Sequence, residues 1–315
     1  MNNDRKSKLL MAEKILITGA TGFLGKILSK ELTGMGYDLY TVGRQSGNNL
    51  QVDLSGGQIE LPHIDDVSMV VHAAGKAHSV PRTKEEEKEF FDVNFEGTKN
   101  LCNALIAAKI KPQAFIFIST VAVYGLDAGE FIKEDHPLLG ETPYAKSKIQ
   151  AEEWLQNWAN DNAIKLAILR LPLVAGPNPP GNLGAMIKGL RSGKYFSIGS
   201  ANAKKSVVWA ADIAKILPAV AAEGGIFNLT DGYDPSFGEL ETGLASVLNA
   251  KKVKKLPYFA AKLLALIGDM AGKRAPINSN RLKKITSTLT FDAGRAIKIL
   301  HWQPTIVINK LSEMI

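Results

Sequence analysis

The chain is poor in the residues on which disulfide-bonded and metal-binding proteins depend, and it has no long uncharged apolar run. Cys102 is its single cysteine, which excludes an internal disulfide, and the apolar segment LCNALIAA around it predicts a buried helical position. The histidines are scattered, and no set of His, Asp and Glu has the spacing of metal ligands, so we expect no bound metal. Residues 256–271 are the most apolar late segment. They include Lys262 and Asp269 and are fewer than the ~20 residues of a membrane span, which predicts a buried or partly buried helix.

Signals for export and for a strongly charged partner are also lacking. The N-terminal segment MNNDRKSKLLMAEK is polar and charged rather than a signal peptide, so we expect a disordered lead, with Met11 as an alternative start, and a cytoplasmic protein. Lys and Arg number 38 against 31 Asp and Glu, a net charge of +7. We interpret the run KKVKK, residues 251–255, as a solvated face rather than a nucleic-acid or membrane contact. The mild positive excess suits a phosphate-bearing substrate.

Short apolar, β-branched segments alternate with helical ones in the first half of the chain. The expected strands are residues 14–18, 37–42, 50–54, 68–75, 114–119 and 165–172, and the longest expected helices are residues 83–109 and 144–159. Because parallel strands need helical crossovers, this order predicts an α/β fold with a Rossmann-type doubly wound parallel sheet. We assign residues 13–172 to a dinucleotide-binding domain and residues 173–315 to a smaller α/β substrate-binding lobe. Residues 207–230 repeat the strand-then-helix pattern and are expected to return to the first domain, with Asp212 as a helix N-cap.

The segment TGATGFLG, residues 18–25, joins the first expected strand to the first helix. Gly19 permits a tight turn, Gly22 lets backbone N–H groups approach a pyrophosphate at the positive helix end, and Gly25 lets helix and strand pack closely. Three glycines in a turn are weak evidence alone, but strand, turn and helix in this order predict a dinucleotide site. The residues expected to bind the cofactor here are Gly19, Thr21, Gly22, Phe23, Leu24 and Gly25.

The ends of the following strands complete the predicted cofactor site. Arg44 follows the second strand, where an acidic residue would bind the ribose 2′-hydroxyl of NAD and an arginine can pair with the 2′-phosphate of NADP. The sequence therefore favours NADP(H), with NAD as the alternative. Asp53, beside Leu54 at the end of the third strand, either accepts a hydrogen bond from adenine or caps a turn. The other residues expected to line the cofactor are Ala73, Ala74, Gly75 and Pro172.

Tyr144 and Lys148 stand four residues apart in YAKSK and therefore lie on one face of the expected helix. A phenol with a pKa near ~10 is a poor base at neutral pH, but a lysine ammonium held close favours the phenolate. This spacing is common by chance, and a solvated helix is the plain alternative. A glycine loop, a strand ending in the hydroxyls of Ser119 and Thr120, and then this helix favour a catalytic pair that also touches the cofactor.

Six segments in order resemble a known family. TGATGFLG, VVHAAG, DVNFEGT, ISTVAVYG, PYAKSK and FDAGRAIKILHWQP are similar to extended short-chain dehydrogenase/reductases of the NAD-dependent epimerase/dehydratase group, over nearly the whole chain from residue 14. The resemblance implies that Tyr144 is the catalytic acid/base and that Lys148 assists it and holds the nicotinamide ribose. It implies that Thr120 orients the reacting sugar oxygen, so Thr120 and Tyr144 also contact substrate. Asn94 would brace the active-site helix, and a homodimer would form through helices near 91–108 and 144–159.

The resemblance also implies further residues for a nucleotide-sugar substrate. Asn182 follows the PNPPG turn, where relatives contact the nucleotide diphosphate. Lys205 stands where many relatives have an arginine that binds the diphosphate, and a lysine keeps the charge but loses the bidentate fork. Arg281 is a further candidate for the same task, and His78, after the fourth strand, is a candidate for contact with the substrate. For each of these four residues, the alternative is a position in a surface turn or a solvated charge without any contact to substrate.

Several functions agree with these features. Arg44 favours a 4-ketoreductase acting at C4 of a nucleotide-activated sugar, expected to be UDP-linked, because a reductase draws on exchangeable NADPH. The alternative is a UDP-sugar 4-epimerase that keeps NAD bound. A non-catalytic dinucleotide sensor on the same fold is less favoured, because Tyr144 and Lys148 are both present. A 4,6-dehydratase is disfavoured, since relatives with that activity place an acidic pair after the hydroxyl, and here the apolar pair Val-Ala follows Thr120.

Overall fold

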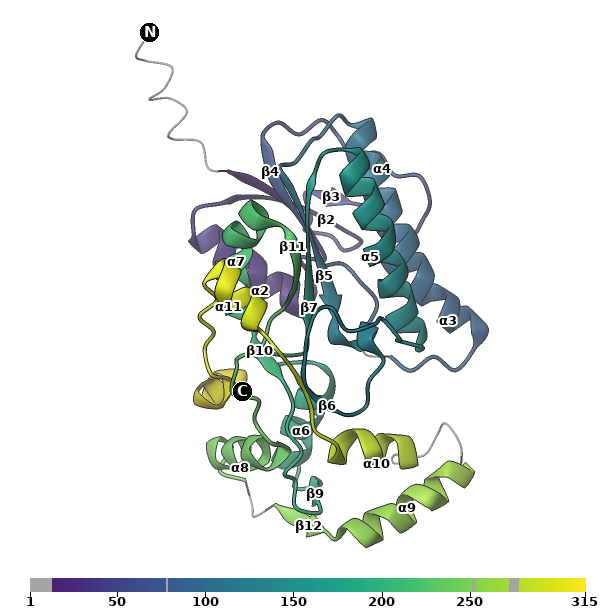
Figure 1. Cartoon of the computed structure of the whole chain (residues 1–315), viewed down its shortest axis with the longest axis vertical. Coiled ribbons are helices and arrows are strands. Elements are labelled where there is room, and N and C mark those ends of the chain that lie inside the picture. The colour runs from purple at the N-terminus through teal and green to yellow at the C-terminus, as the bar shows by residue number, and fades with distance from the viewer. Residues whose placement is uncertain (1–12, 78, 251–252, 272–277) are drawn as a thin grey trace.

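A seven-stranded parallel sheet is the centre of the protein (Figure 1). The structure is a computed structural model that describes residues 13–77, 79–250, 253–271 and 278–315. Within the sheet the strands follow the order β3-β2-β1-β4-β5-β7-β11. They are β1 (Lys14–Thr18), β2 (Asp38–Gly43), β3 (Leu50–Gln51), β4 (Val67–His72), β5 (Ala114–Thr120), β7 (Lys165–Leu171) and β11 (Gly225–Asn228). The predicted Rossmann-type doubly wound sheet is confirmed, although β3 and β4 are shorter than the sequence predicted.

Apolar side chains alternate between the two faces of this sheet, and helices cover both faces (Figure 1). In β1, Ile15 and Ile17 point to one face and Leu16 to the other. The first face is covered by α2 (Phe23–Gly34), α7 (Ala210–Glu223) and α11 (Gly294–Leu300), and the second by α4 (Gly97–Ala107) and α5 (Pro143–Asp161). Cys102 is fully buried on the second face, as predicted.

The helix predicted over residues 83–109 is interrupted. α3 (Lys84–Phe91), capped by the Thr83 hydroxyl, and α4 are separated by a π-helical turn at Asp92–Glu96. Such turns widen the helix by one residue and are frequent at functional sites. The buried aromatic residue of α3 is Phe90.

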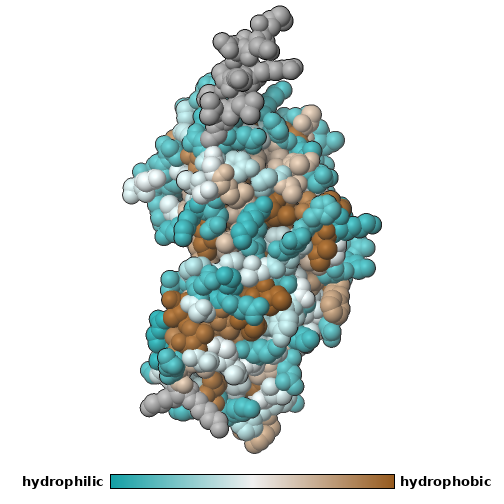
Figure 2. Space-filling model, turned by 90° about the vertical axis from the view of Figure 1, so that its left-hand side faces the viewer, coloured by the Kyte–Doolittle hydropathy of each residue, from teal (hydrophilic) through white to brown (hydrophobic). Residues whose placement is uncertain are grey.

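In the described part of the chain, three pairs of short parallel strands lie outside the main sheet. They are β8 (Leu173–Ala175) with β10 (Val207–Trp209), β9 (Phe196–Ile198) with β12 (Lys254–Leu256), and β6 (Gly129–Ile132) with β13 (Leu289–Phe291). α6 (Gly181–Arg191), α8 (Phe237–Val247) and a 3₁₀ segment, Val307–Met314, share a core with β8 and β10. α9 (Tyr258–Ala271) and α10 (Ser279–Thr286) pack together at the lower end of the view in Figure 1. The side view in Figure 2 shows an indentation between the upper and lower parts of the surface.

One prediction about an individual segment was wrong, and another holds only in its weaker form. Asp212 is not an N-cap: Trp209 occupies that position, and the buried Asp212 carboxylate accepts a hydrogen bond from the Thr305 backbone N–H (2.6 Å) and pairs with Lys215 (2.9 Å). The late apolar segment forms a helix, α9, that is partly rather than fully buried: Ala261, Ala265 and Gly268 are covered, and most of its large apolar side chains are exposed. β11 completes the main sheet, α7 packs on it, and β10 pairs with β8 outside it, while the domain boundaries themselves stay a prediction.

Candidate functional site

The loop between β1 and α2 has the backbone shape that a dinucleotide phosphate requires. Gly19 has a φ of +72°, and a Cβ added there would lie 2.6–2.8 Å from the backbone of Ala73 and Ala74. A Cβ added at Gly25 would overlap the Gly19 carbonyl oxygen, so loop and helix touch through their backbones. Gly22 is the N-cap of α2, and no side chain among the described residues caps this end. First-turn N–H groups are therefore available to an anion, which fits a pyrophosphate.

Arg44 and Asp53 lie together at the carboxyl ends of β2 and β3. Their charged groups are 4.0 Å apart, and the side chains are 70% and 49% exposed. The Asp53 carboxylate accepts hydrogen bonds from the Ser55 N–H (3.0 Å) and hydroxyl (2.7 Å), and these bonds lower its pKa. Asp53 thus caps a turn, which was one of its two predicted roles; the contact with adenine stays a prediction. Leu54, beside it, is buried.

Gly75 brings the chain after β4 against the helix that carries the predicted catalytic pair. A Cβ at Gly75 would lie 3.0 Å from Asn94 Oδ1 and 3.4 Å from Lys148 Nζ. Any larger residue would therefore crowd both groups. The remaining residues predicted to line the cofactor are partly buried and lie around the same edge of the sheet: Thr21, Phe23, Leu24 and Pro172.

Asn94 occupies the π-helical turn and is fully buried. Its Oδ1 accepts a hydrogen bond from the Lys76 N–H (2.7 Å), and its Nδ2 donates to the Lys76 carbonyl (3.1 Å) and to Ser147 Oγ (3.0 Å). Ser147 belongs to α5, between Tyr144 and Lys148. Asn94 therefore ties the loop after β4 to the active-site helix, and its predicted bracing contacts are present.

Thr120 and Tyr144 form a hydroxyl pair at the end of β5. The start of α5 is set by Thr142, whose hydroxyl accepts from the Ala145 N–H (3.1 Å), and by Pro143 in the first turn. Burial raises the pKa of the Tyr144 phenol above its ordinary value, while a hydrogen bond with Thr120 opposes the shift. The sequence had suggested that lysine would favour the phenolate; in this structure desolvation dominates, and the phenol is held protonated at neutral pH.

Lys148 lies one helical turn after Tyr144 and is only 4% exposed. Its ammonium donates to the Ile118 carbonyl (2.8 Å) and sits 4.3 Å from the centroid of the Phe117 ring. Burial lowers the pKa of Lys148 to about 8, and the negative charge of Glu152 partly opposes this shift. The lysine therefore changes charge close to neutral pH, unlike an exposed lysine.

The sequence did not lead us to predict the buried ion pair that follows this lysine by one helical turn. Glu152, four residues after Lys148, binds Arg170 of β7 at 2.7 Å, with both side chains at most 3% exposed, and accepts a hydrogen bond from Ser119. Arg170 also donates to the hydroxyl of Tyr124 (3.1 Å). A signal was present, because Arg170 follows the apolar residues 166–169 in the strand, and a charge in a buried strand needs a partner.

His72 supports the same edge of the sheet. Its ring nitrogens lie 2.6 Å from Thr18 Oγ1 and 2.9 Å from Thr98 Oγ1. Burial lowers the pKa of His72 to about 3, and the charge of Lys148 contributes in the same direction. The ring is thus neutral, and Thr18 in turn accepts from the Ala74 N–H (3.1 Å). His72 holds together the ends of two strands that flank the predicted cofactor site.

Three residues predicted to bind the nucleotide diphosphate lie outside the main sheet, on separate segments: Asn182, Lys205 and Arg281. Asn182 is exposed in the first turn of α6, and Arg281 is exposed on α10. Burial lowers the pKa of Lys205 to about 8, Asp127 opposes the shift and Lys284 adds to it, so these three charges lie close together. His78 lies outside the described residues. Lys205 is therefore the candidate whose surroundings best suit an anionic partner.

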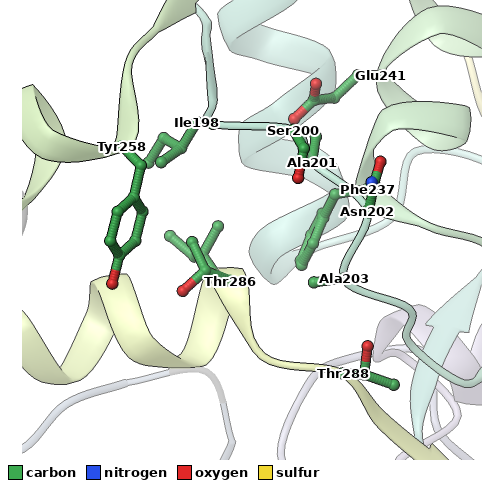
Figure 3. Close-up of a pocket in the computed structure, with 12 residues that line it drawn as sticks. Ile198, Ser200, Ala201, Asn202, Ala203, Phe237, Glu241, Tyr258, Thr286 and Thr288 are labelled. Atoms are coloured by element: carbon green, nitrogen blue, oxygen red, sulfur yellow. The ribbon is translucent and has the colours of Figure 1, made fainter.

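A pocket of about 410 Å³ lies outside the main sheet, lined in part by residues that precede Lys205 in the chain. Figure 3 shows Tyr258 of α9 and Phe237 of α8 on opposite sides of it, with Thr286 of α10 between them. The strand-to-loop segment 198–203 forms another wall. Two aromatic rings, hydroxyls and exposed loop backbone are suited to a planar polar group. The catalytic pair is not among its lining residues.

Metal ligands and membrane-spanning helices are both lacking in the part of the chain that the structure describes. Within that part, no three His, Cys, Asp or Glu side chains are arranged so that they could hold a metal ion. Likewise, none of the helices in these described ranges is long and apolar enough to cross a membrane.

Known proteins resemble the chain in both sequence and structure. A relative from Vibrio cholerae, named UDP-glucose 4-epimerase, is 30% identical over 96% of this chain and 92% of its own. A relative from Escherichia coli O157:H7, named N-acetyl-alpha-D-glucosaminyl-diphospho-ditrans,octacis-undecaprenol 4-epimerase, is 29% identical over 90% of this chain and 89% of its own. The solved UDP-glucose 4-epimerase of Thermotoga maritima, with UDP-glucose, superposes with a TM-score of 0.73 at 20% identity over 96% of this chain and 97% of its own.

The solved UDP-glucose 4-epimerase of Thermus thermophilus, in complex with NAD, has a TM-score of 0.72 at 18% identity over the same shares of the two chains. The sequence model described as "NAD dependent epimerase/dehydratase family" matches residues 15–230, more than half of the chain. The glycine loop, the hydroxyl pair and the buried lysine all lie within this match. The chain therefore belongs to the NAD-dependent epimerase/dehydratase family of extended short-chain dehydrogenase/reductases, which are enzymes.

Proposed function

We propose that this enzyme transfers a hydride at C4 of a sugar carried on a diphosphate, and that it acts as a 4-ketoreductase. The observation that carries the proposal is the hydroxyl pair Thr120 and Tyr144 beside the buried Lys148, at the edge of the sheet that holds the glycine loop. A proton donor and an oxygen-orienting hydroxyl next to a dinucleotide cradle are what carbonyl reduction requires.

The raised pKa of Tyr144 means that its phenol can donate a proton at neutral pH, as the reductive step requires. A nicotinamide held at the glycine loop would supply the hydride for the sugar carbon. Tyr144 is protonated at neutral pH and gives its proton to the C4 oxygen; this proton and the hydride at carbon together turn the ketone into an alcohol, and Thr120 holds the oxygen in place. The Lys148 ammonium stabilises the phenolate that remains until solvent reprotonates it. Asn94, through Ser147 and the Lys76 backbone, keeps α5 in position against the loop after β4.

Arg44 supports NADPH as the reductant. An exposed ion pair of 4.0 Å with Asp53 is worth about 0–1 kcal/mol, so Arg44 can leave Asp53 to pair with a 2′-phosphate at little cost. Residues 44–46, directly after β2, include no acidic residue that would bind a ribose 2′-hydroxyl.

A second candidate function is a 4-epimerase that retains NAD. The relatives from Vibrio cholerae and Escherichia coli, at 30% and 29% identity, carry 4-epimerase names and favour it. The two candidates share the chemistry of Tyr144 and Lys148. They differ in whether the dinucleotide exchanges in each turnover or stays bound.

Lys205 is our candidate for the substrate diphosphate, because a phosphate would restore the charge that burial disfavours. The names of the relatives give two groups that a diphosphate could carry, a uridine or a polyprenol. We propose UDP, with the uracil in the pocket between Phe237 and Tyr258. Assays with a UDP-sugar and with a polyprenyl-diphosphate sugar show which of these two groups the substrate diphosphate carries.

The first test is to denature the purified protein and identify the nucleotide that it releases. An empty protein, or one carrying NADP, supports the reductase, and oxidation of NADPH with a UDP-4-keto-6-deoxy sugar should then be observed. Near-stoichiometric NAD together with interconversion of UDP-sugar epimers would overturn the reductase in favour of the epimerase.

Tyr144→Phe tests the shared chemistry. This change removes the acidic proton and keeps the ring, so turnover should fall by at least ~100-fold while cofactor affinity stays nearly constant. Steady-state rates and cofactor titrations provide the comparison. Activity within severalfold of the unmodified enzyme would contradict the assignment. Residence in the cytoplasm and a homodimer through α4 and α5 stay predictions from the sequence.

A further inference from the structure

Helix α9 has the opposite arrangement to that of an ordinary surface helix. Its buried stripe consists of its smallest residues, Ala261, Ala265 and Gly268, which follow the i, i+4, i+7 spacing. The large apolar side chains point outward, and five of them form what we call the outer stripe: Phe259 (76% exposed), Leu263 (61%), Leu266 (50%), Ile267 (56%) and Met270 (90%).

This stripe is unusual because a soluble protein normally turns such side chains toward its core. α9 contacts its neighbours through Ala261 and Ala265, which meet Leu282 of α10 and the β9–β12 pair. Small residues on the inside allow close packing on α10 but bury little apolar area. The apolar surface of α9 is therefore directed away from the fold.

Basic residues surround this helix. In the sequence, residues 251–286 contain ten Lys and Arg and one acidic residue, Asp269, so this segment carries +9 while the rest of the chain carries −2. Among the described residues, Lys254 and Lys255 precede α9 and Lys262 lies on it, and these three are exposed. Lys283 and Lys284 of α10 are exposed too, but they pair with Asp127 at 3.8 and 3.5 Å, so the first three are the lysines that border the outer stripe. The Asp269 carboxylate is engaged by the N–H (3.0 Å) and hydroxyl (2.5 Å) of Ser279.

An apolar stripe bordered by lysines matches the surface of an anionic bilayer, in which the acyl region takes apolar side chains and the headgroups take cations. A second protein surface would have to supply both an apolar groove and several carboxylates. In this chain the surplus charge is positive in the same segment, so a second copy would place like charges together. α9 also lies at the lower end of the molecule in Figure 1, away from the main sheet.

We propose that α9 is an interfacial helix that docks the enzyme on an anionic membrane surface through its outer stripe and the surrounding lysines. The helix lies in the plane of the interface and does not span the bilayer. Tyr258, its first residue, lines the pocket in Figure 3, so docking places the mouth of that pocket beside the headgroups. The proposal does not depend on the C4 chemistry, and it replaces the interpretation of the basic run as a merely solvated face.

The test is sedimentation of the whole protein with vesicles. Vesicles of phosphatidylglycerol and phosphatidylethanolamine are compared with pure phosphatidylcholine vesicles, each at low and at high salt. We expect co-sedimentation with the anionic vesicles that weakens at high salt, because the lysines supply part of the attraction. A folded protein that stays in the supernatant with anionic vesicles at low salt would overturn the proposal.

A matched pair of double variants distinguishes binding through the outer stripe from non-specific binding by any exposed apolar residue. Phe259→Gln with Ile267→Gln removes two of its residues, while Phe131→Gln with Ile297→Gln removes the same residue types at similar exposure elsewhere (65% and 51%). The first variant should lose at least ~10-fold in vesicle affinity and the control variant less than ~2-fold. None of these residues is in the proposed catalytic machinery, so thermal unfolding should show that both variants fold.

Two further outcomes refute the inference. Equal losses of vesicle affinity in the two variants would show that the outer stripe has no special role. A concentration-dependent dimer that is lost in the first variant and kept in the control variant would show that a second copy, rather than a bilayer, covers α9.

Discussion

Replacing Lys148 with methionine should stabilise the protein while it abolishes turnover. The ammonium is 4% exposed, and its pKa of about 8 lies well below the ordinary value of 10.5. Each pKa unit corresponds to about 1.36 kcal/mol, so the buried charge costs roughly 3 kcal/mol of folding free energy at pH 7. Methionine fills a similar volume without charge. It also leaves the Ile118 carbonyl without its donor, which costs about 1 kcal/mol. The expected net gain is about 2 kcal/mol.

The gain should depend on pH with a definite sign. Below pH 8 the lysine is charged in both the folded and the unfolded protein, and its full cost applies. Between pH 8 and 10.5 it is neutral when folded and charged when unfolded, so the unfolded state binds more protons and the enzyme with Lys148 gains stability as pH rises. The advantage of Lys148→Met should therefore shrink from pH 7 to pH 10. Urea unfolding at both pH values measures this change.

Lys146→Met is the matched control, because Lys146 is exposed on the same helix. We expect this control to alter the free energy of unfolding by less than ~0.5 kcal/mol at either pH. A Lys148→Met variant that is less stable than the unmodified protein at pH 7 would refute the reasoning, as would a difference that is equal at the two pH values.

The remaining predictions concern the cofactor and the bracing of α5. Arg44→Ala should weaken binding of NADPH by about 1–3 kcal/mol and of NADH much less, which calorimetric titration of both cofactors measures; equal losses would remove the reason to prefer NADP. Asn94→Ala should lower the free energy of unfolding by about 1–3 kcal/mol and reduce kcat more than KM, because it leaves buried partners at Lys76 and Ser147 unpaired. Unchanged stability and kcat would show that Asn94 braces nothing.

The cofactor side of the molecule followed closely from sequence. Strand, glycine turn and helix obey local rules, because a positive φ at Gly19 and the backbone contact at Gly25 admit little besides glycine. The spacing of Tyr144 and Lys148 likewise placed both on one helix, since a helix repeats every 3.6 residues. These features depend on neighbours in the chain, so a pattern of residues reveals them.

The charged interior was harder to foresee. Arg170 and Glu152 lie on a strand and a helix, and their pairing depends on how α5 packs across β5 and β7. The pKa of Tyr144 moved opposite to the expectation from its spacing to Lys148, because desolvation acts through every atom around the phenol and not through one neighbour.

By itself, then, the sequence determined the doubly wound sheet, the glycine loop and the helix of the predicted catalytic pair, because each follows from short-range periodicity or from the backbone freedom of glycine. Tertiary structure alone decided which face of α9 is covered: its apolar composition indicated burial, yet its small residues meet α10 and its large ones remain outside. It also decided the π-helical turn that brings Asn94 to Ser147. Both outcomes depend on packing between segments distant in the chain, which no local pattern encodes.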